Sequence, residues 1–230
     1  MHASALHRRL LGGALVILGG SAVACSSDNT FAPTAVASVL TENAGVEGQT
    51  GTVATVLATP ISIKLTQNGQ PVAGAAVTWT VQAGGGAVDA ATSTTDAEGN
   101  AVVHWTLGTV AGADTLIGTS VDGATSIITA TAVAGPATAV TIVSGDAQSV
   151  SAGAVAQPLV VKVADQYGNG VAGATVTWSV SGLTLDNTTT TTDAAGLAQV
   201  VPTMSGTSGA YTITASVTGF APVTFTETES

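Results

Sequence analysis

Few side chains in this sequence could carry out acid–base or nucleophilic chemistry. His104 is the only histidine downstream of His7. A catalytic dyad or triad would need a nucleophile and an orienting acid within hydrogen-bond reach of it, and no sequence motif supplies them. Apolar residues alternate around it at Ala101, Val103 and Trp105, which places His104 on the opposite, solvent-facing side of a strand. We therefore expect no catalytic role for His104.

Among the carboxylates, Asp96 and Glu98 are the pair in the first half of the chain that could suggest acid–base chemistry. Paired carboxylates perform acid–base work in enzymes such as glycosidases. Asp193 stands at the equivalent place later in the chain with no second acid, so a turn in which aspartate accepts backbone N–H groups explains the pattern better. The segment 165–170 has oxygen-bearing side chains but only one carboxylate, too few for calcium. We expect no catalytic residue, metal or cofactor, although a count of acids leaves an uncharacterised hydrolase open.

Composition excludes further classes of function. The 230 residues carry a formal net charge of −10, and the only cations are Arg8, Arg9, Lys64 and Lys162. Nucleic acid is excluded as a partner, since phosphate contacts need clustered Lys and Arg. Zinc sites need several Cys or His ligands, and the chain has 1 Cys. Hydrophobic residues make up 45% of the chain, enough for folded cores rather than global disorder.

The N-terminus has the layout of a secretory signal peptide. Arg8 and Arg9 precede an apolar run from Leu10 to Ala24, which is shorter than the roughly 20 residues that a membrane-spanning helix needs. Small residues close the run as Ala22-Val-Ala-Cys25, and Cys25 is the single cysteine. An intramolecular disulfide is therefore impossible, and the place of Cys25 directly after the run needs its own explanation.

The segment Ala22–Cys25 resembles the lipobox of bacterial lipoproteins, with Ala22 where leucine is commonest. The resemblance implies that residues 1–24 are a cleaved lipoprotein signal peptide and that the thiol of Cys25 carries lipid. Two or more acyl chains anchor a protein stably. Residues 25–33 would then form a lipidated tether, and Ser26 after the cysteine implies the outer membrane or the cell surface. The alternative is ordinary cleavage after Ala24, which leaves a free thiol.

The rest of the chain contains an internal repeat. The segment Gln70–Trp79 recurs about 100 residues later as Asn169–Trp178. Thr95-Asp-Ala-Glu-Gly99 recurs at a similar distance as Thr192-Asp-Ala-Ala-Gly196. A repeat of this length fits a complete small domain. We expect a first domain over residues 34–135 and a second over 136–230, with the boundary near Gly135-Pro136.

Each copy is predicted to be all-β. Short runs rich in Val, Ile and Thr alternate apolar and polar residues between turns of Gly, Asn and Asp. About seven strands per copy predict a tandem pair of immunoglobulin-like β-sandwiches, with single strands over 100–107 and 197–204. Trp79 and Trp178 occupy inward positions, so we expect one tryptophan-bearing core in each copy.

Three segments of the second copy together resemble the bacterial Ig-like domain of group 1, the invasin and intimin type. They are Asp165-Gln-Tyr-Gly-Asn169, Val171-Ala-Gly-Ala-Thr-Val-Thr-Trp178 and Thr192-Asp-Ala-Ala-Gly-Leu-Ala198. The first copy departs from the pattern at Thr66-Gln-Asn-Gly-Gln70. The resemblance implies the sandwich fold and, as in that family, an extracytoplasmic spacer, in some members an adhesive one.

The expected function is that of a non-enzymatic, lipid-anchored cell-envelope protein whose two domains act as a stalk or adhesion module. The alternative is a module that binds a protein or glycan through loops at the free end of the second domain. Trp79, Trp105 and Trp178 all take inward positions, so no exposed aromatic stripe favours a glycan over a protein. The expected partners are the membrane, through lipid on Cys25, and such a ligand.

Overall fold

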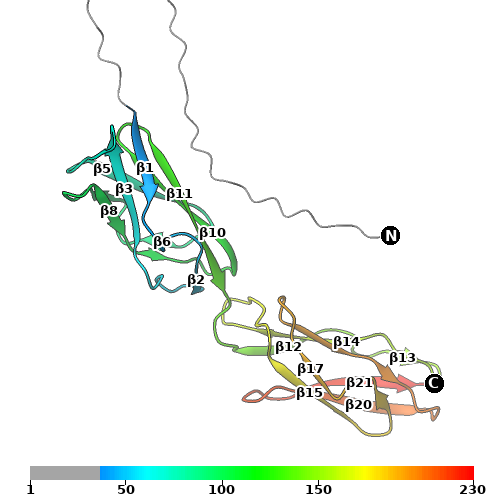
Figure 1. Cartoon of the computed structure of the whole chain (residues 1–230). Helices are drawn as coiled ribbons and strands as arrows, with labels where there is room; N and C mark the ends of the chain where they lie inside the picture. Colours follow the sequence, from blue (N-terminus) through cyan, green and yellow to red (C-terminus); the bar gives the residue numbers. More distant parts are fainter. Residues whose placement is uncertain (1–36) are drawn as a thin grey trace, which may run out of the picture. The chain divides into compact units, whose positions relative to one another are not determined.

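The computed structural model describes residues 37–230, and every regular element in this range is a β-strand. The strands form two separate β-sandwiches, as the fold prediction required (Figure 1). None of the described residues forms a helix long and apolar enough to cross a membrane. The predicted signal peptide, tether and Cys25 all lie outside the described range.

The first sandwich packs a four-stranded sheet against a five-stranded sheet. In the smaller sheet β3 lies between β1 and β8 and also pairs with β4. The larger sheet has the order β2-β11-β10-β5-β7, and β6 pairs with β9 as a short ribbon. The strands are β1 (Ser38–Glu42), β2 (Gln49–Thr52), β3 (Ile61–Gln67), β4 (Gln70–Pro71), β5 (Ala76–Ala83), β6 (Ala87–Val88), β7 (Thr92–Thr94), β8 (Asn100–Val103), β9 (Trp105–Thr106), β10 (Gly112–Ser120) and β11 (Thr125–Val133).

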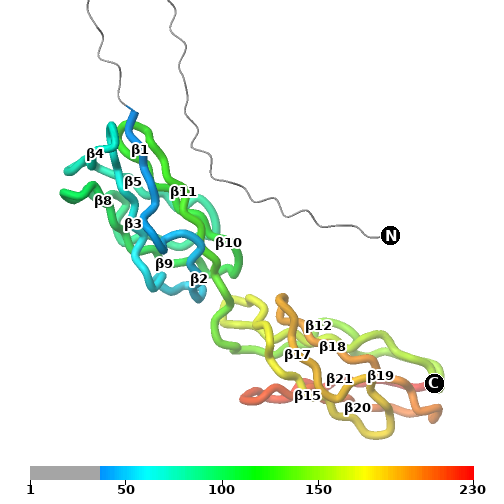
Figure 2. Tube along the Cα trace, in the orientation of Figure 1, coloured from blue at the N-terminus to red at the C-terminus, as the bar shows by residue number. Residues whose placement is uncertain are grey.

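The second sandwich repeats this plan. Its smaller sheet has the order β12-β14-β18, its larger sheet β13-β21-β20-β15-β17, and β16 pairs with β19. The chain passes from β11 into it at β12 (Figure 2). The strands are β12 (Ala139–Ser144), β13 (Ser149–Val150), β14 (Leu159–Ala164), β15 (Thr175–Val180), β16 (Thr184–Leu185), β17 (Thr189–Thr191), β18 (Leu197–Val200), β19 (Pro202–Thr203), β20 (Gly209–Ser216) and β21 (Val223–Glu229).

The two single strands predicted over 100–107 and 197–204 are each interrupted. His104 separates β8 from β9, and Val201 separates β18 from β19. At each break an aspartate carboxylate accepts the backbone N–H: Asp89 from His104 at 2.9 Å and Asp186 from Val201 at 2.7 Å. The chain therefore leaves one sheet and pairs with a short ribbon strand. Periodicity could not reveal this, because the inward alternation continues unbroken through the switch.

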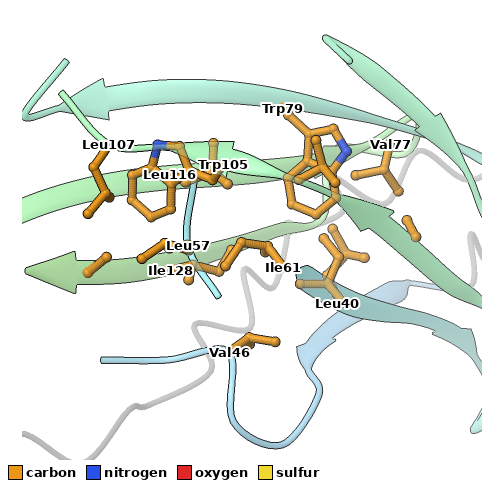
Figure 3. Packing of buried hydrophobic residues seen from close by; sticks show 14 of the residues in the cluster. Leu40, Val46, Leu57, Ile61, Val77, Trp79, Trp105, Leu107, Leu116 and Ile128 are labelled. Atoms are coloured by element: carbon orange, nitrogen blue, oxygen red, sulfur yellow. The ribbon is translucent and has the colours of Figure 1, made fainter. Parts of the chain in front are cut away.

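Each sandwich has its own hydrophobic core. The first contains Trp79 and Trp105, which are 4% and 0% exposed, and the second contains Trp178, which is 2% exposed. Figure 3 shows Trp79, Trp105 and Leu116 gathered between the strands of the first sandwich. No buried residue is shared between the two clusters of the described chain. Burial of apolar surface therefore stabilises each sandwich separately.

The two copies accommodate the repeated tryptophan differently. Trp79 lies opposite Gly118 on the neighbouring strand, where a Cβ atom would come within 2.4 Å of Ile63 and 3.1 Å of the indole. Trp178 lies opposite Ala215 instead and packs against Phe225 with a ring-centroid distance of 6.0 Å. The indole N–H groups donate to Ser93 and Thr190 respectively, both at 2.8 Å. Buried indole nitrogens usually find such partners, but the indole nitrogen of Trp105 has none among residues 37–230.

Candidate functional site

The one histidine in the described range pairs with an aspartate at the surface. The Nδ1 atom of His104 lies 2.8 Å from a carboxylate oxygen of Asp89, and the two side chains are 54% and 52% exposed. The hydrogen bond from the backbone N–H of His104 is the main cause that lowers the pKa of Asp89, and the hydrogen bond with the His104 ring is the second. Asp186 accepts the equivalent backbone N–H in the second sandwich without any histidine. The aspartate therefore serves the strand switch, and sequence reasoning missed it because it lies 15 residues from His104.

The carboxylates of Asp96 and Asp193 close equivalent turns. Asp96 accepts the N–H groups of Glu98 at 3.0 Å and Asn100 at 2.8 Å. Asp193 accepts those of Ala195 at 2.8 Å and Leu197 at 2.9 Å. The hydrogen bond from the Asn100 N–H is the largest influence on Asp96 and lowers its pKa. Both acids are thus engaged with backbone, as the turn interpretation requires.

Asp165 and Asn169 form a third and denser turn. Asp165 is 3% exposed, and its carboxylate accepts the N–H groups of Tyr167, Asn169 and Gly135, each at 2.9 Å. The side-chain amide of Asn169 also donates to it at 2.9 Å. Burial acts to raise the pKa of Asp165, but these hydrogen bonds together outweigh it and lower the pKa. The carboxylate is fully engaged and is not a free metal ligand.

The sequence prediction also missed two buried glutamates on β21. Glu227 is 0% exposed and Glu229 2% exposed. Glu229 accepts hydrogen bonds from the N–H groups of Gly153, Ser205 and Gly206 and from the Ser205 hydroxyl. Burial favours the neutral form, yet these donors prevail and lower the pKa of Glu229. Glu229 therefore joins the loop that contains Gly153 to the loop that contains Ser205 and Gly206.

Glu227 has far less support. One oxygen accepts the Gln148 N–H at 3.1 Å, and the other, Oε1, has no hydrogen-bond partner among residues 37–230. Burial, aided by the negative charge of Asp146, raises the pKa of Glu227 to about 7. Asp114 in the first sandwich is similar: burial raises its pKa and Oδ1 has no partner within the described range. The sequence pattern could have indicated that Glu227 is buried, because Glu227 lies two residues after Phe225 and therefore on the same face of β21.

The described residues contain no group of three or more His, Cys, Asp and Glu side chains that could hold a metal ion. A hollow of about 320 Å³ is lined by residues 52–55 together with Gly135, Asp165 and Tyr167. Its one carboxylate is Asp165, whose oxygens already accept four hydrogen bonds. Asp96, Asp165 and Asp193 lie in separate turns, and each carboxylate accepts backbone N–H groups of its own turn.

Comparison with solved structures finds proteins that are similar to this chain. The chain is similar to InvD of Yersinia pseudotuberculosis, with 18% identity and a TM-score of 0.53 over 84% of this chain and 57% of that one. The Escherichia coli adhesin FdeC has 15% identity and a TM-score of 0.47 over 84% and 66%. Invasin, an integrin-binding protein, has 23% identity and a TM-score of 0.39 over 85% and 40%. The chain thus spans about half the length of InvD and less of invasin.

No curated protein sequence matches the chain. The family model of the bacterial Ig-like domain (group 1) matches residues 139–228, which run from β12 to within one residue of the end of β21. The first sandwich has the same sheet plan but lies outside this match. The second sandwich is therefore a bacterial Ig-like domain of group 1, preceded in the same chain by a sandwich of like architecture.

Proposed function

We propose that this protein is a non-enzymatic, lipid-anchored component of the bacterial cell envelope whose two sandwiches form a stalk or an adhesion module. The observation that carries the proposal is the use of the acids: the carboxylates of Asp89, Asp96, Asp165, Asp193 and Glu229 all hold backbone N–H groups in place. Independent support comes from the group 1 Ig-like match of residues 139–228. Fold alone does not fix function, so the site chemistry matters here.

The anchor is tested by replacing Cys25 with Ser in the full chain. We expect the wild-type protein in the detergent phase of a phase-partitioning experiment and the variant in the aqueous phase, because only the thiol can accept the lipid. Ser26→Ala is the matched control, since it changes the neighbouring hydroxyl and keeps the thiol. A Cys25→Ser protein that remains in the detergent phase would exclude the lipid anchor.

A second candidate is ligand binding by loops at one end of the second sandwich. The loop 205–208 is held by Glu229 and by Tyr211, whose hydroxyl donates to Thr207 O at 2.7 Å and lies 2.7 Å from the Ser205 hydroxyl. Thr203, two residues before this loop, forms an isolated β-bridge with Val155, and Val155 is 62% exposed. A pre-ordered loop with an exposed apolar residue suits recognition of a protein surface.

This candidate is separated from a pure stalk by probing the protein against an array of extracellular-matrix proteins and glycans. Binding that is lost in Val155→Asp, but kept when the exposed Val102 of the first sandwich is changed to Asp, supports recognition by this end. Absence of binding across both panels favours the stalk.

A further inference from the structure

The turn Asp165–Asn169 reaches beyond the second sandwich. The side chain of Asn169 accepts the N–H of Ala111 at 2.8 Å and donates to the carbonyl oxygen of Thr109 at 2.9 Å. Both partners lie in the loop between β9 and β10 of the first sandwich. We propose that this turn is a latch: an interaction surface whose partner is the 109–111 loop and which fixes the orientation of one sandwich against the other.

The latch is built so that Asn169 meets the loop without rearranging. Asp165 accepts both the backbone N–H and the side-chain N–H of Asn169. The side-chain oxygen of Asn169 then accepts from the Ala111 N–H, and its amide nitrogen also donates to the Thr109 carbonyl oxygen. A single asparagine thus satisfies one donor and one acceptor, which a carboxylate cannot do because it only accepts.

Asp165 also holds the segment that connects the sandwiches. Its Oδ2 atom accepts the N–H of Gly135, two residues after the end of β11. Asp165 therefore holds the connecting segment, and Asn169, which is hydrogen-bonded to Asp165, holds the 109–111 loop. Since the hydrophobic cores are separate, these directional hydrogen bonds supply the specificity of the joint.

The first sandwich has a different turn at the matching place. Its hairpin reverses over Asn68 and Gly69, both with positive φ, between the paired residues Gln67 and Gln70. No carboxylate stands there. At Thr66–Gln70, where the first copy departs from the family pattern, threonine and glutamine stand in place of the latch residues Asp165 and Asn169.

The opposite end of the second sandwich shows the complementary difference. By strand register, its loop 205–208 corresponds to the loop 108–111 of the first sandwich. Ser205 and Gly206 donate to Glu229 of their own sandwich, whereas the strand position of Glu229 is occupied by Ala132 in the first. In the loop 108–111 the Gly108 N–H donates to Asp114 of its own sandwich at 3.4 Å, whereas the Ala111 N–H and the Thr109 carbonyl oxygen bond to Asn169.

The latch is tested by distance measurement between spin labels in the full chain. Cys25→Ser removes the native thiol, and labels are placed at the exposed strand residues Val102 and Val143. We expect a narrow distance distribution with the native turn and a broad one in Asn169→Ala. Gln70→Ala is the matched control, because it changes the corresponding turn of the first sandwich and should leave the distribution narrow.

A second variant guards against damage to the second sandwich itself. Ala111→Pro removes the N–H that donates to Asn169 and leaves the Asp165–Asn169 turn unchanged. It should broaden the distribution as Asn169→Ala does. In Asn169→Ala, the Ala111 amide should exchange with solvent about fivefold faster, as expected for loss of one hydrogen bond.

A broad distribution in the native protein, or a narrow one in both Asn169→Ala and Ala111→Pro, would overturn the latch. The measurement involves neither lipid nor ligand. Its failure would therefore leave the proposed function standing, and failure of that function would leave the latch standing.

Discussion

Glu227 gives the second sandwich a pH-dependent stability of unusual sign. Burial raises its pKa from the usual 4.5 to about 7, so the folded protein keeps a proton that the unfolded chain releases between these two values. Stability is therefore lost as pH rises from about 4.5 to about 7 and stays constant above that. Glu227→Gln removes the titration while it keeps an oxygen that can accept the Gln148 N–H.

The magnitude follows from the shift. Each pKa unit corresponds to about 1.36 kcal/mol, so the full shift would amount to about 3 kcal/mol of unfolding free energy. Solvent screening and relaxation around the carboxylate reduce this, and we expect about 1 to 2 kcal/mol. The prediction concerns the change with pH and not the absolute stability, because the glutamine amide introduces donors of its own at the place of the unpaired Oε1.

The assay is urea unfolding of the wild-type protein and of Glu227→Gln from pH 4 to pH 8. The unfolding free energy of the variant minus that of the wild type should rise by the predicted amount over this range. Glu229→Gln is the matched control on the same strand. The pKa of native Glu229 is lowered, so its ionised carboxylate stabilises the fold at neutral pH. Glu229→Gln should therefore be less stable than the wild type at neutral pH, and this difference should shrink as the pH falls below about 4.5.

A difference between Glu227→Gln and wild type that is independent of pH would refute this reasoning. It would mean that Glu227 is ionised at neutral pH with its charge compensated. Identical pH profiles for Glu227→Gln and Glu229→Gln would refute it as well, since the argument rests on their opposite hydrogen-bond environments.

Three further predictions concern the cores and the surface. Trp178→Ala should cost about 3 to 5 kcal/mol and shift only one of two calorimetric transitions, because the cores are separate; a shift of both transitions would contradict this. Gly118→Val should destabilise the first sandwich by about 1 to 3 kcal/mol, since a Cβ meets Ile63 and Trp79; an unchanged chemical melt would be inconsistent with that packing. His104→Ala should change stability by less than about 1 kcal/mol, because Asp89 still accepts the backbone N–H; a larger loss in thermal melts would give the imidazole a role that its exposure does not suggest.

Alternation of apolar and polar residues predicted the strands that have one buried face, whereas β2 and β7 contain no buried residue. In β3 the buried residues are Ile61, Ile63 and Leu65, the same set that the sequence pattern selects. The method fails where a polar residue takes the buried parity. Glu227 and Glu229 follow Phe225 at every second position, but their hydrogen-bond donors come from loops that periodicity does not place.

The joint between the sandwiches could be only half predicted. The segment 165–169 is identifiable as a turn from Asp, Gly and Asn alone, and its geometry bears this out. The partners Thr109 and Ala111 lie 60 and 58 residues away in sequence and contribute only backbone atoms. Backbone groups carry no residue-type signal, so the contact emerges only from the fold.

The proposed stalk or adhesion role requires both sandwiches to stand at the outer surface of the cell, and labelling intact cells with a membrane-impermeant amine reagent tests this requirement. Lys64 and Lys162 are the only lysines in the sequence, one in each sandwich, and both are partly exposed. Both lysines should be labelled on intact cells as fully as in lysed cells, while a periplasmic marker stays unlabelled. Labelling of the two lysines only after lysis would contradict it.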